Sequence, residues 1–186
     1  MAPFSRLLAA LKDVPDPRRA EGKRYPLPYL LMFTVLALLS GARSYRGVIT
    51  FLEQRHGLLN EHFGTNLKRA LAVNTVRAVL QALDAEALEM AFRHHAKALL
   101  DLVGTKEERP GVALDGKTLR GSFDHLADRK AAQVLTAFAS EAAIVLAHTQ
   151  IDETSNEIPA AQKMIRDLGL TGVILTADAM HCQKNL

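Results

Sequence analysis

Apolar residues recur at helical spacing along the first part of the chain. Val76, Val79, Leu80 and Leu83, for example, fall on one face of a 3.6-residue period, which is typical of an amphipathic helix. The same pattern, with helix ends expected at Ser40-Gly41 and Gly57 and N-caps at Asn74 and Asp84, predicts further helices. The predicted helices cover residues 4–11, 27–39, 45–53, 75–83 and 85–103.

The pattern changes after a polar stretch, residues 104–111, that contains Pro110. Short apolar runs predict strands over residues 112–114, 133–139, 142–147 and 172–177, and a helix is expected over 156–168. The order strand, strand, strand, helix, strand predicts antiparallel hairpins followed by a crossover helix that leads to a parallel strand. We therefore expect an α+β protein with a helical domain over 1–108 and an α/β domain over 109–186.

Two of the predicted strands lead directly into an aspartate. Asp115 follows Val112–Leu114, and Asp178 follows the run that ends at Ala177. If the two strands are adjacent and parallel, these carboxylates lie about one strand spacing apart, near 4.8 Å. That separation suits two oxygen ligands that share a divalent metal, as phosphoryl transfer requires. Each aspartate taken alone is better explained as an ordinary strand end, and Asp115-Gly116 is a common turn pair.

Composition is consistent with a folded protein that carries a basic N-terminal region. Of the 186 residues, 48% are hydrophobic, and the single cysteine excludes an intramolecular disulfide. No apolar run reaches the roughly 18–20 residues of a membrane span, so we expect no membrane contact and a cytoplasmic protein. The net charge of +3 is uneven, because residues 1–60 hold nine Lys or Arg and four acids. This asymmetry fits polyanion binding, although a solvated basic surface explains it as well.

Several short sequence motifs resemble those of one known family. Three motifs are similar to those of the H-repeat-associated, ISAs-type insertion-sequence transposases: DGKTLRGS at 115–122, SNEIPA at 155–160 and TADAM at 176–180. DVPDPRR at 13–19, with the helices from Pro28 onward, resembles the helical domain that precedes the catalytic domain in that family. The resemblance extends over nearly the whole chain and implies the start of an RNase H-like DDE catalytic domain.

The resemblance also implies site residues and a cofactor. In that family two aspartates and a downstream glutamate hold two metal ions, Mg²⁺ or Mn²⁺. Asp115 and Asp178 match the aspartates, whereas no position of this chain matches the glutamate. We therefore expect a C-terminally truncated transposase, inactive alone, whose partner is double-stranded DNA and which has the potential to form homo-oligomers.

Basic residues supply the expected DNA contacts. The pairs Arg18-Arg19 and Lys23-Arg24 lie in a proline-bounded segment and are candidates for backbone phosphate contacts. Lys117 and Arg120 could neutralise a phosphate beside Asp115, and exposed hairpin charges are an equally good account. Residues 74–100 could form a helix-turn-helix, or two antiparallel helices that pack on residues 30–39.

Two function classes remain open from the sequence. The first is a transposase that transfers polynucleotides by metal-dependent phosphodiester displacement. The second is a non-catalytic DNA-binding or assembly remnant of such a protein. A haloacid-dehalogenase-type phosphatase, suggested by the words around Asp115, is excluded because its mechanism needs an acid where this chain has Lys117.

Overall fold

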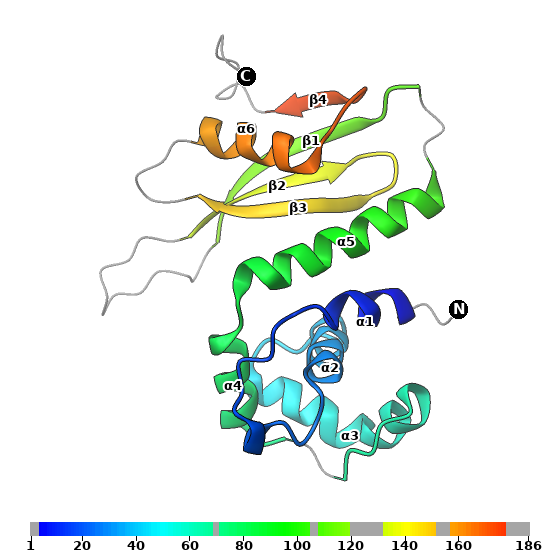
Figure 1. The fold of residues 1–186 in the computed structure, drawn as a ribbon, viewed down its shortest axis with the longest axis vertical. Helices are drawn as coiled ribbons and strands as arrows, with labels where there is room; N and C mark the ends of the chain where they lie inside the picture. The colour runs from blue at the N-terminus through cyan, green and yellow to red at the C-terminus, as the bar shows by residue number, and fades with distance from the viewer. Residues whose placement is uncertain (1–3, 69–70, 105–107, 120–131, 152–156, 178–186) are drawn as a thin grey trace. The chain divides into compact units, whose positions relative to one another are not determined.

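The computed structural model describes residues 4–68, 71–104, 108–119, 132–151 and 157–177, except the side chains of Glu21 and Glu157. The chain forms two compact units, Met1–Phe92 and Arg93–Leu186. The first is helical and the second contains the sheet (Figure 1). The division falls inside a helix, α5 (Ala85–Val103), and the domain boundary expected near residue 108 stays a prediction.

The helical unit is built around α2 (Leu27–Leu39), which is apolar on nearly all sides. A helix of this kind is stable in water only when other elements cover it. Here α1 (Ser5–Leu11) and α3 (Tyr45–Phe63) pack against it, and α4 (Val73–Ala82) packs against α3. Met32 and Phe33, 0% and 1% exposed, lie at the centre of the resulting core. A single 3₁₀ turn, η1 (Ala20–Gly22), precedes α2.

The helix α3 is longer than its sequence predicted. Its N-cap is Ser44, whose Oγ accepts a hydrogen bond from the backbone N–H of Gly47 at 3.1 Å. The prediction that Gly57 ends it was wrong, because the helix continues to Phe63 and ends at Gly64 in the left-handed conformation, with φ +63°. An interior glycine costs a helix only about 1 kcal/mol. Leu59, buried beyond Gly57 in the core, helps to hold the last turns in place.

Of the two N-caps that were predicted, Asn74 and Asp84, only the second is present in the structure. The backbone N–H groups of Glu86 and Ala87 donate to Asp84 Oδ1 at 2.9 and 3.2 Å, so the predicted cap of α5 is confirmed. The predicted cap at Asn74 was wrong. α4 begins at Val73, after Ala72, and no side chain accepts a hydrogen bond there.

The second unit contains a four-stranded sheet of order β3-β2-β1-β4. β1 (Gly111–Thr118), β2 (Gln133–Ala139) and β3 (Ile144–Ile151) are antiparallel neighbours, and β4 (Ile174–Ala177) is parallel to β1. The central place of the first strand, between the second and the fourth, was predicted and is confirmed. The parallel connection requires a crossover element, which α6 (Glu157–Leu168) supplies.

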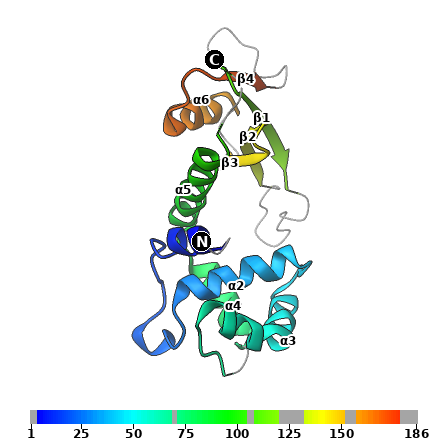
Figure 2. The ribbon, with the colours of Figure 1, turned by 90° about the vertical axis from the view of Figure 1, so that its right-hand side faces the viewer.

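The helix α6 covers one face of the sheet (Figure 2). Ala161 and Met164 on this helix, 0% and 1% exposed, pack against buried strand residues. The strand residues of this core are Val112, Leu114, Leu135, Ala137, Ala139, Leu146, Ala147 and Ile151. The protein is thus of the mixed α+β class that was predicted, with a helical first part followed by strands.

Candidate functional site

Asp115 is presented by the central strand on the face opposite α6. Its neighbour Leu114 is 4% exposed and belongs to the core under α6, whereas Asp115 is exposed. Because successive side chains of a strand point to opposite faces, the Asp115 carboxylate projects away from that core. Across the sheet it lies in one row with Thr136 and His148. An ionised carboxylate there is open to a ligand from solvent.

The end of the β1–β4 pairing bears on the predicted proximity of Asp115 and Asp178. The parallel register runs from Gly111 opposite Ile174 to Leu114 opposite Ala177. Asp115 is the next residue on β1, and Asp178 is the next residue in sequence after β4. Asp178 lies outside the described residues, so the predicted proximity of the two carboxylates remains a prediction.

The strand that carries Asp115 does not stop there. The sequence predicted a strand over 112–114 with Asp115 at its polar end, and that boundary was wrong. β1 continues to Thr118 because Asp115 to Thr118 keep their antiparallel pairing with β2. Asp115 is therefore held in extended backbone on one side, at the point where the described pairing with β4 ends.

Lys117 lies two residues beyond Asp115 on the same strand and is exposed. The spacing of two places both side chains on the same face, with their Cα atoms about 6–7 Å apart. A cation at that distance is well placed to contact a phosphate near Asp115. Arg120, the other predicted contact in this region, lies outside the described residues.

Arg18 forms the centre of a hydrogen-bond network in the segment before α2. Its Nε and Nη2 donate to Asp16 Oδ1 and Oδ2 at 2.9 and 2.8 Å. Nη1 donates to the carbonyl of Gly22 at 3.1 Å, and Nη2 also donates to that of Tyr25 at 2.7 Å. The hydrogen bonds from Arg18 hold the pKa of the Asp16 carboxyl below its usual value, and the charge of Lys23 adds to this effect. All three guanidinium nitrogens are thus engaged within the chain.

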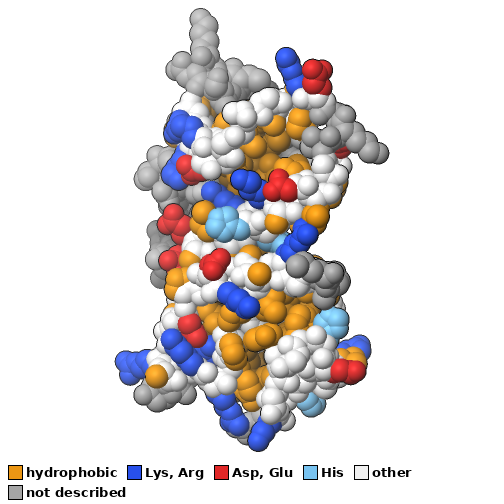
Figure 3. Space-filling view, turned by 45° about the vertical axis from the view of Figure 1, so that its right-hand side comes forward, with side chains coloured by type: hydrophobic (Ala, Val, Ile, Leu, Met, Phe, Trp, Pro, Cys, Tyr) orange, Lys and Arg blue, Asp and Glu red, His pale blue; other side chains and the backbone are white. Residues whose placement is uncertain are grey.

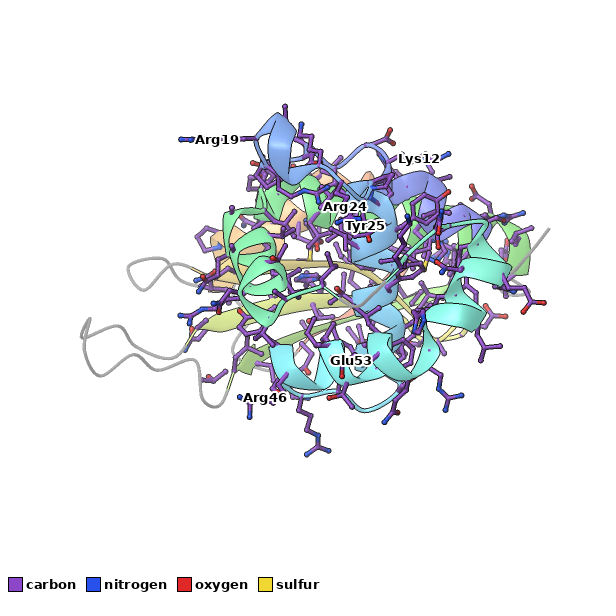
Figure 4. All side chains as sticks on the ribbon, turned by 90° about the horizontal axis from the view of Figure 1, so that it is seen from below. Lys12, Arg19, Arg24, Tyr25, Arg46 and Glu53 are labelled. Carbon is purple, nitrogen blue, oxygen red and sulfur yellow. The ribbon has the colours of Figure 1, made fainter. Side chains whose placement is uncertain are left out.

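The other three basic residues of this segment are exposed. Arg19, Lys23 and Arg24 flank the 3₁₀ turn η1, whose position is fixed by Arg18. Arg19 projects away from the ribbon, and Arg24 lies next to Tyr25 with its guanidinium carbon 5.7 Å from the ring centroid (Figure 4). In the space-filling view, Lys and Arg side chains line the lower margin of the helical unit (Figure 3). Three of the four phosphate contacts that were predicted in this segment are therefore exposed to solvent.

Sequence reasoning missed two polar residues that shape the helical unit. It did not anticipate the Asp16–Arg18 pair, although the Asp-Pro-Arg spacing places them two residues apart. It also missed Asn60, whose amide oxygen accepts hydrogen bonds from Thr65 Oγ1 and the backbone N–H of Leu67, both at 2.8 Å. The sequence gives no specific indication of Asn60, because the predicted helix ended before it and other polar residues follow it.

Two properties of the described residues bear on function. Within the described ranges, no group of three or more His, Cys, Asp or Glu residues is arranged to hold a metal ion. No helix in the same ranges combines the length and the apolar character needed to cross a membrane.

The order of helical unit, hairpin strands, crossover helix and parallel strand agrees with the order that the sequence predicted. Residues 8–96 match the family model described as DDE_Tnp_1-associated. No solved structure matches the chain.

Several curated relatives are proteins of Escherichia coli. "H repeat-associated putative transposase YhhI" of strain K12 is 28% identical over 184 residues, which are 98% of this chain and 47% of that protein. "H repeat-associated putative transposase YbfD" of the same strain is 26% identical, over 98% of this chain and 70% of that protein. "Putative transposase YncI" of strain K12 is 29% identical, over 97% and 71%.

The family model and these relatives support the assignment of the chain to the H repeat-associated putative transposases. The chain spans about half the length of YhhI, namely 47%. The matches extend through both units, since 98% of this chain is aligned.

Proposed function

We propose that this chain provides the DNA-binding helical unit and the first part of the metal-dependent cleavage centre of a DNA transposase. The observation that carries the proposal is the parallel register of β1 and β4, which runs up to Leu114 opposite Ala177. If this register continues by one residue, Asp115 and Asp178 become neighbours on adjacent strands. Their carboxylates would then lie roughly 4–7 Å apart, within reach of shared metal ligands.

The residues fit a hard divalent cation. Asp115 is exposed, offers only oxygen acceptors when ionised, and lies on the sheet face opposite the α6 core. Carboxylate oxygens are the ligands that Mg²⁺ and Mn²⁺ prefer. Asp115 and Asp178 would hold the cation, which when bound supplies Lewis-acid polarisation of the phosphodiester and of the attacking water or 3′-hydroxyl. Lys117 and Arg120 would position the neighbouring phosphates.

The resemblance to the transposase family implies a third carboxylate, a glutamate that no position of these 186 residues matches. Two carboxylates leave a two-metal centre under-coordinated. We therefore expect the 186-residue chain, tested alone, to bind DNA without cutting it.

The helical unit would bind the DNA backbone through Arg19, Lys23 and Arg24, which are exposed. In this proposal Arg18 acts as a positioning residue, because its guanidinium is engaged with Asp16 and two carbonyl groups. Contacts of this kind release counterions from the duplex, so the affinity should fall steeply with salt.

A second candidate function is a non-catalytic DNA-binding or assembly protein. It is favoured by the three exposed cations Arg19, Lys23 and Arg24 of the helical unit, which can contact DNA phosphates without a metal ion. Both candidates predict DNA binding, and they differ in whether Asp115 and Asp178 bind a divalent cation.

Binding and cleavage can be tested on the same purified chain. Gel-shift titrations of a duplex in a salt series should show binding that weakens with a log–log slope of about −0.9 per phosphate contact. Supercoiled plasmid with Mg²⁺ or Mn²⁺ should stay uncut. Nicking that disappears in Asp115→Ala and Asp178→Ala would show that the chain is competent for cleavage through these residues and that the expected inactivity is wrong. Absence of any duplex binding would contradict the DNA-binding part.

A further inference from the structure

A hollow of about 280 Å³ lies at the start of α2 in the helical unit. Tyr25, Tyr29 and Phe33 form its aromatic side, and Arg24 belongs to its lining. The opposite side comes from the segment after α3, which includes Thr65 and Asn66. Apart from Arg24, neither the carboxylate site nor the phosphate contacts described above use this hollow, which we call the tyrosine pocket.

The first wall of the tyrosine pocket is held by Arg18. The guanidinium donates to the carbonyl of Tyr25 at 2.7 Å and to that of Gly22 at 3.1 Å, while Asp16 holds it from the other side. The Arg18 side chain is only 9% exposed, and its hydrogen bonds to Asp16 and Tyr25 are partly buried, whereas the one to Gly22 is exposed. The backbone that carries Arg24 and Tyr25 is therefore fixed before any ligand arrives.

The second wall is held by Asn60. Its Oδ1 accepts from Thr65 Oγ1 and from the Leu67 N–H at 2.8 Å, and its Nδ2 donates to the Leu67 carbonyl at 2.9 Å. The left-handed Gly64 starts this segment, and the Thr65 N–H donates to the Asn60 carbonyl at 3.1 Å. Both walls are thus preorganised, which lowers the entropy lost when a ligand binds.

The lining of the pocket combines aromatic rings with a cation. Phe33 is 1% exposed, whereas Tyr25 and Tyr29 are half-buried. Arg24 is exposed and lies over the Tyr25 ring, 5.7 Å from its centroid. None of the lining residues, all of which are described, is acidic. Such a lining suits a flat ring that is attached to an anion, since rings stack on aromatic side chains and Arg pairs with phosphate.

The size of the pocket restricts the ligand further. Pockets for drug-sized molecules occupy about 300–1,000 Å³, and this one, at about 280 Å³, is just below that range. It therefore accommodates a single ring system. A base inside a duplex is paired and stacked, and must leave the helix before it can enter such a pocket.

We propose that the tyrosine pocket binds the base of an unpaired nucleotide of DNA, with the adjacent phosphate at Arg24. Tyr25 and Tyr29 stack on the base, Asn66 and Thr65 offer hydrogen bonds to its edge, and Arg24 neutralises the phosphate. The inference rests on the proposed DNA binding of the helical unit, and it is independent of the metal site. It assigns to that unit a preference for single-stranded segments over a fully paired duplex.

The tyrosines provide a direct readout. The chain has no tryptophan and three tyrosines, two of which line the pocket. Titration of the full 186-residue chain with a short oligothymidylate should quench tyrosine emission as a base stacks, while a fully paired duplex of equal length should quench it far less. The titration needs no metal ion, so it does not depend on the carboxylate pair.

Variants separate stacking from general attraction. Tyr25→Leu and Tyr29→Leu should each weaken single-strand binding by roughly 5- to 150-fold, the equivalent of about 1–3 kcal/mol per stacked base. Tyr29→Phe keeps the ring and should retain the affinity, which guards against an effect of misfolding, since Tyr29 also contacts Phe33. Tyr45→Phe is the matched control, because Tyr45 is exposed and does not line the pocket.

Each outcome decides between the two proposals. Quenching by the single strand together with the expected loss in the leucine variants supports the pocket. Duplex and single-strand binding without a change in tyrosine emission overturns the pocket and leaves the electrostatic DNA binding intact. Leucine variants that fold, as judged by circular dichroism, and keep full single-strand affinity also overturn it. Failure to bind either form of DNA overturns both the pocket and the proposed DNA binding.

Discussion

Arg18 and Asp16 form a bidentate ion pair, in which Nε donates to Oδ1 at 2.9 Å and Nη2 donates to Oδ2 at 2.8 Å. The same guanidinium reaches the carbonyl groups of Gly22 and Tyr25. One side chain thereby fixes a loop that presents Arg19, Lys23 and Arg24 to solvent and that forms one wall of the tyrosine pocket. The geometry of the proposed DNA-binding surface thus depends on a residue that is itself largely covered.

The ion pair predicts a pH dependence of stability. Since the pKa of Asp16 is lower in the folded protein than its usual 3.8, the pair contributes its full stabilisation above pH 3.8 and loses it as the pH falls through the lowered pKa. Asp16→Asn should therefore reduce the free energy of unfolding at neutral pH by about 1 kcal/mol. The difference between variant and parent should shrink below pH 3.8. Urea unfolding at a series of pH values measures it, and a difference that does not change with pH would contradict the assignment.

Neighbouring arginines should respond differently to the same substitution. Arg18→Lys removes the bidentate hydrogen bonds to Asp16 and should lower the free energy of unfolding by about 1–3 kcal/mol. Arg19→Lys, at an exposed position, should change it by less than about 0.5 kcal/mol. Urea unfolding followed by circular dichroism compares the two variants. Equal effects would mean that Arg18 does not hold the loop.

Two glycines near the end of α3 form a second matched pair. Gly57 lies inside the helix, and a Cβ added there would meet no atom within 4 Å, so Gly57→Ala should stabilise the protein by about 0.5–1 kcal/mol. Gly64 has the same free space but a φ of +63°. Gly64→Ala should destabilise by about 1–2 kcal/mol, since a Cβ disfavours the left-handed conformation. Thermal unfolding of both variants measures the opposite signs, and a shift of the same sign in both would contradict this explanation.

The outer edge of β4 predicts self-association. In the described part of the chain this strand pairs only with β1, and its Ile174 is 53% exposed. Unpaired apolar strand edges tend to pair with other chains. Ile174→Lys should therefore shift the protein toward the monomer in sedimentation velocity, whereas Leu58→Lys, at another exposed apolar position (60%) on α3, should not. Equal behaviour of both variants would place self-association elsewhere.

The sheet was predictable because each strand is marked by a short run of neighbouring residues. Runs such as Val112–Leu114 and Gln133–Ala139 have strand periodicity, and the intervening helix forces the last connection to be parallel. The ends of elements were less predictable, since packing decides them. The burial of Leu59 stabilises the turns of α3 that follow Gly57, and pairing with β2 extends β1 beyond Asp115.

The candidate site was predictable in part. The strand pattern placed Asp115 on the central strand, and the structure agrees. The partners of Arg18 were not predictable, because a charged residue in a proline-bounded segment gives no sign of whether it faces solvent or the carbonyl groups of Gly22 and Tyr25. The network of Asn60 is hidden for the same reason, since its partners lie five to seven residues away.

The central claim is that Asp115 and Asp178 share a divalent cation. The most direct measurement is the broadening of backbone amide resonances by substoichiometric Mn²⁺ in ¹⁵N-labelled protein, for the parent chain, Asp115→Asn and Asp178→Asn. A shared site predicts that Mn²⁺ selectively broadens the amides around both aspartates in the parent chain, and that either substitution abolishes the broadening at both places. Broadening confined to one aspartate, or broadening that survives both substitutions, would contradict a shared metal site.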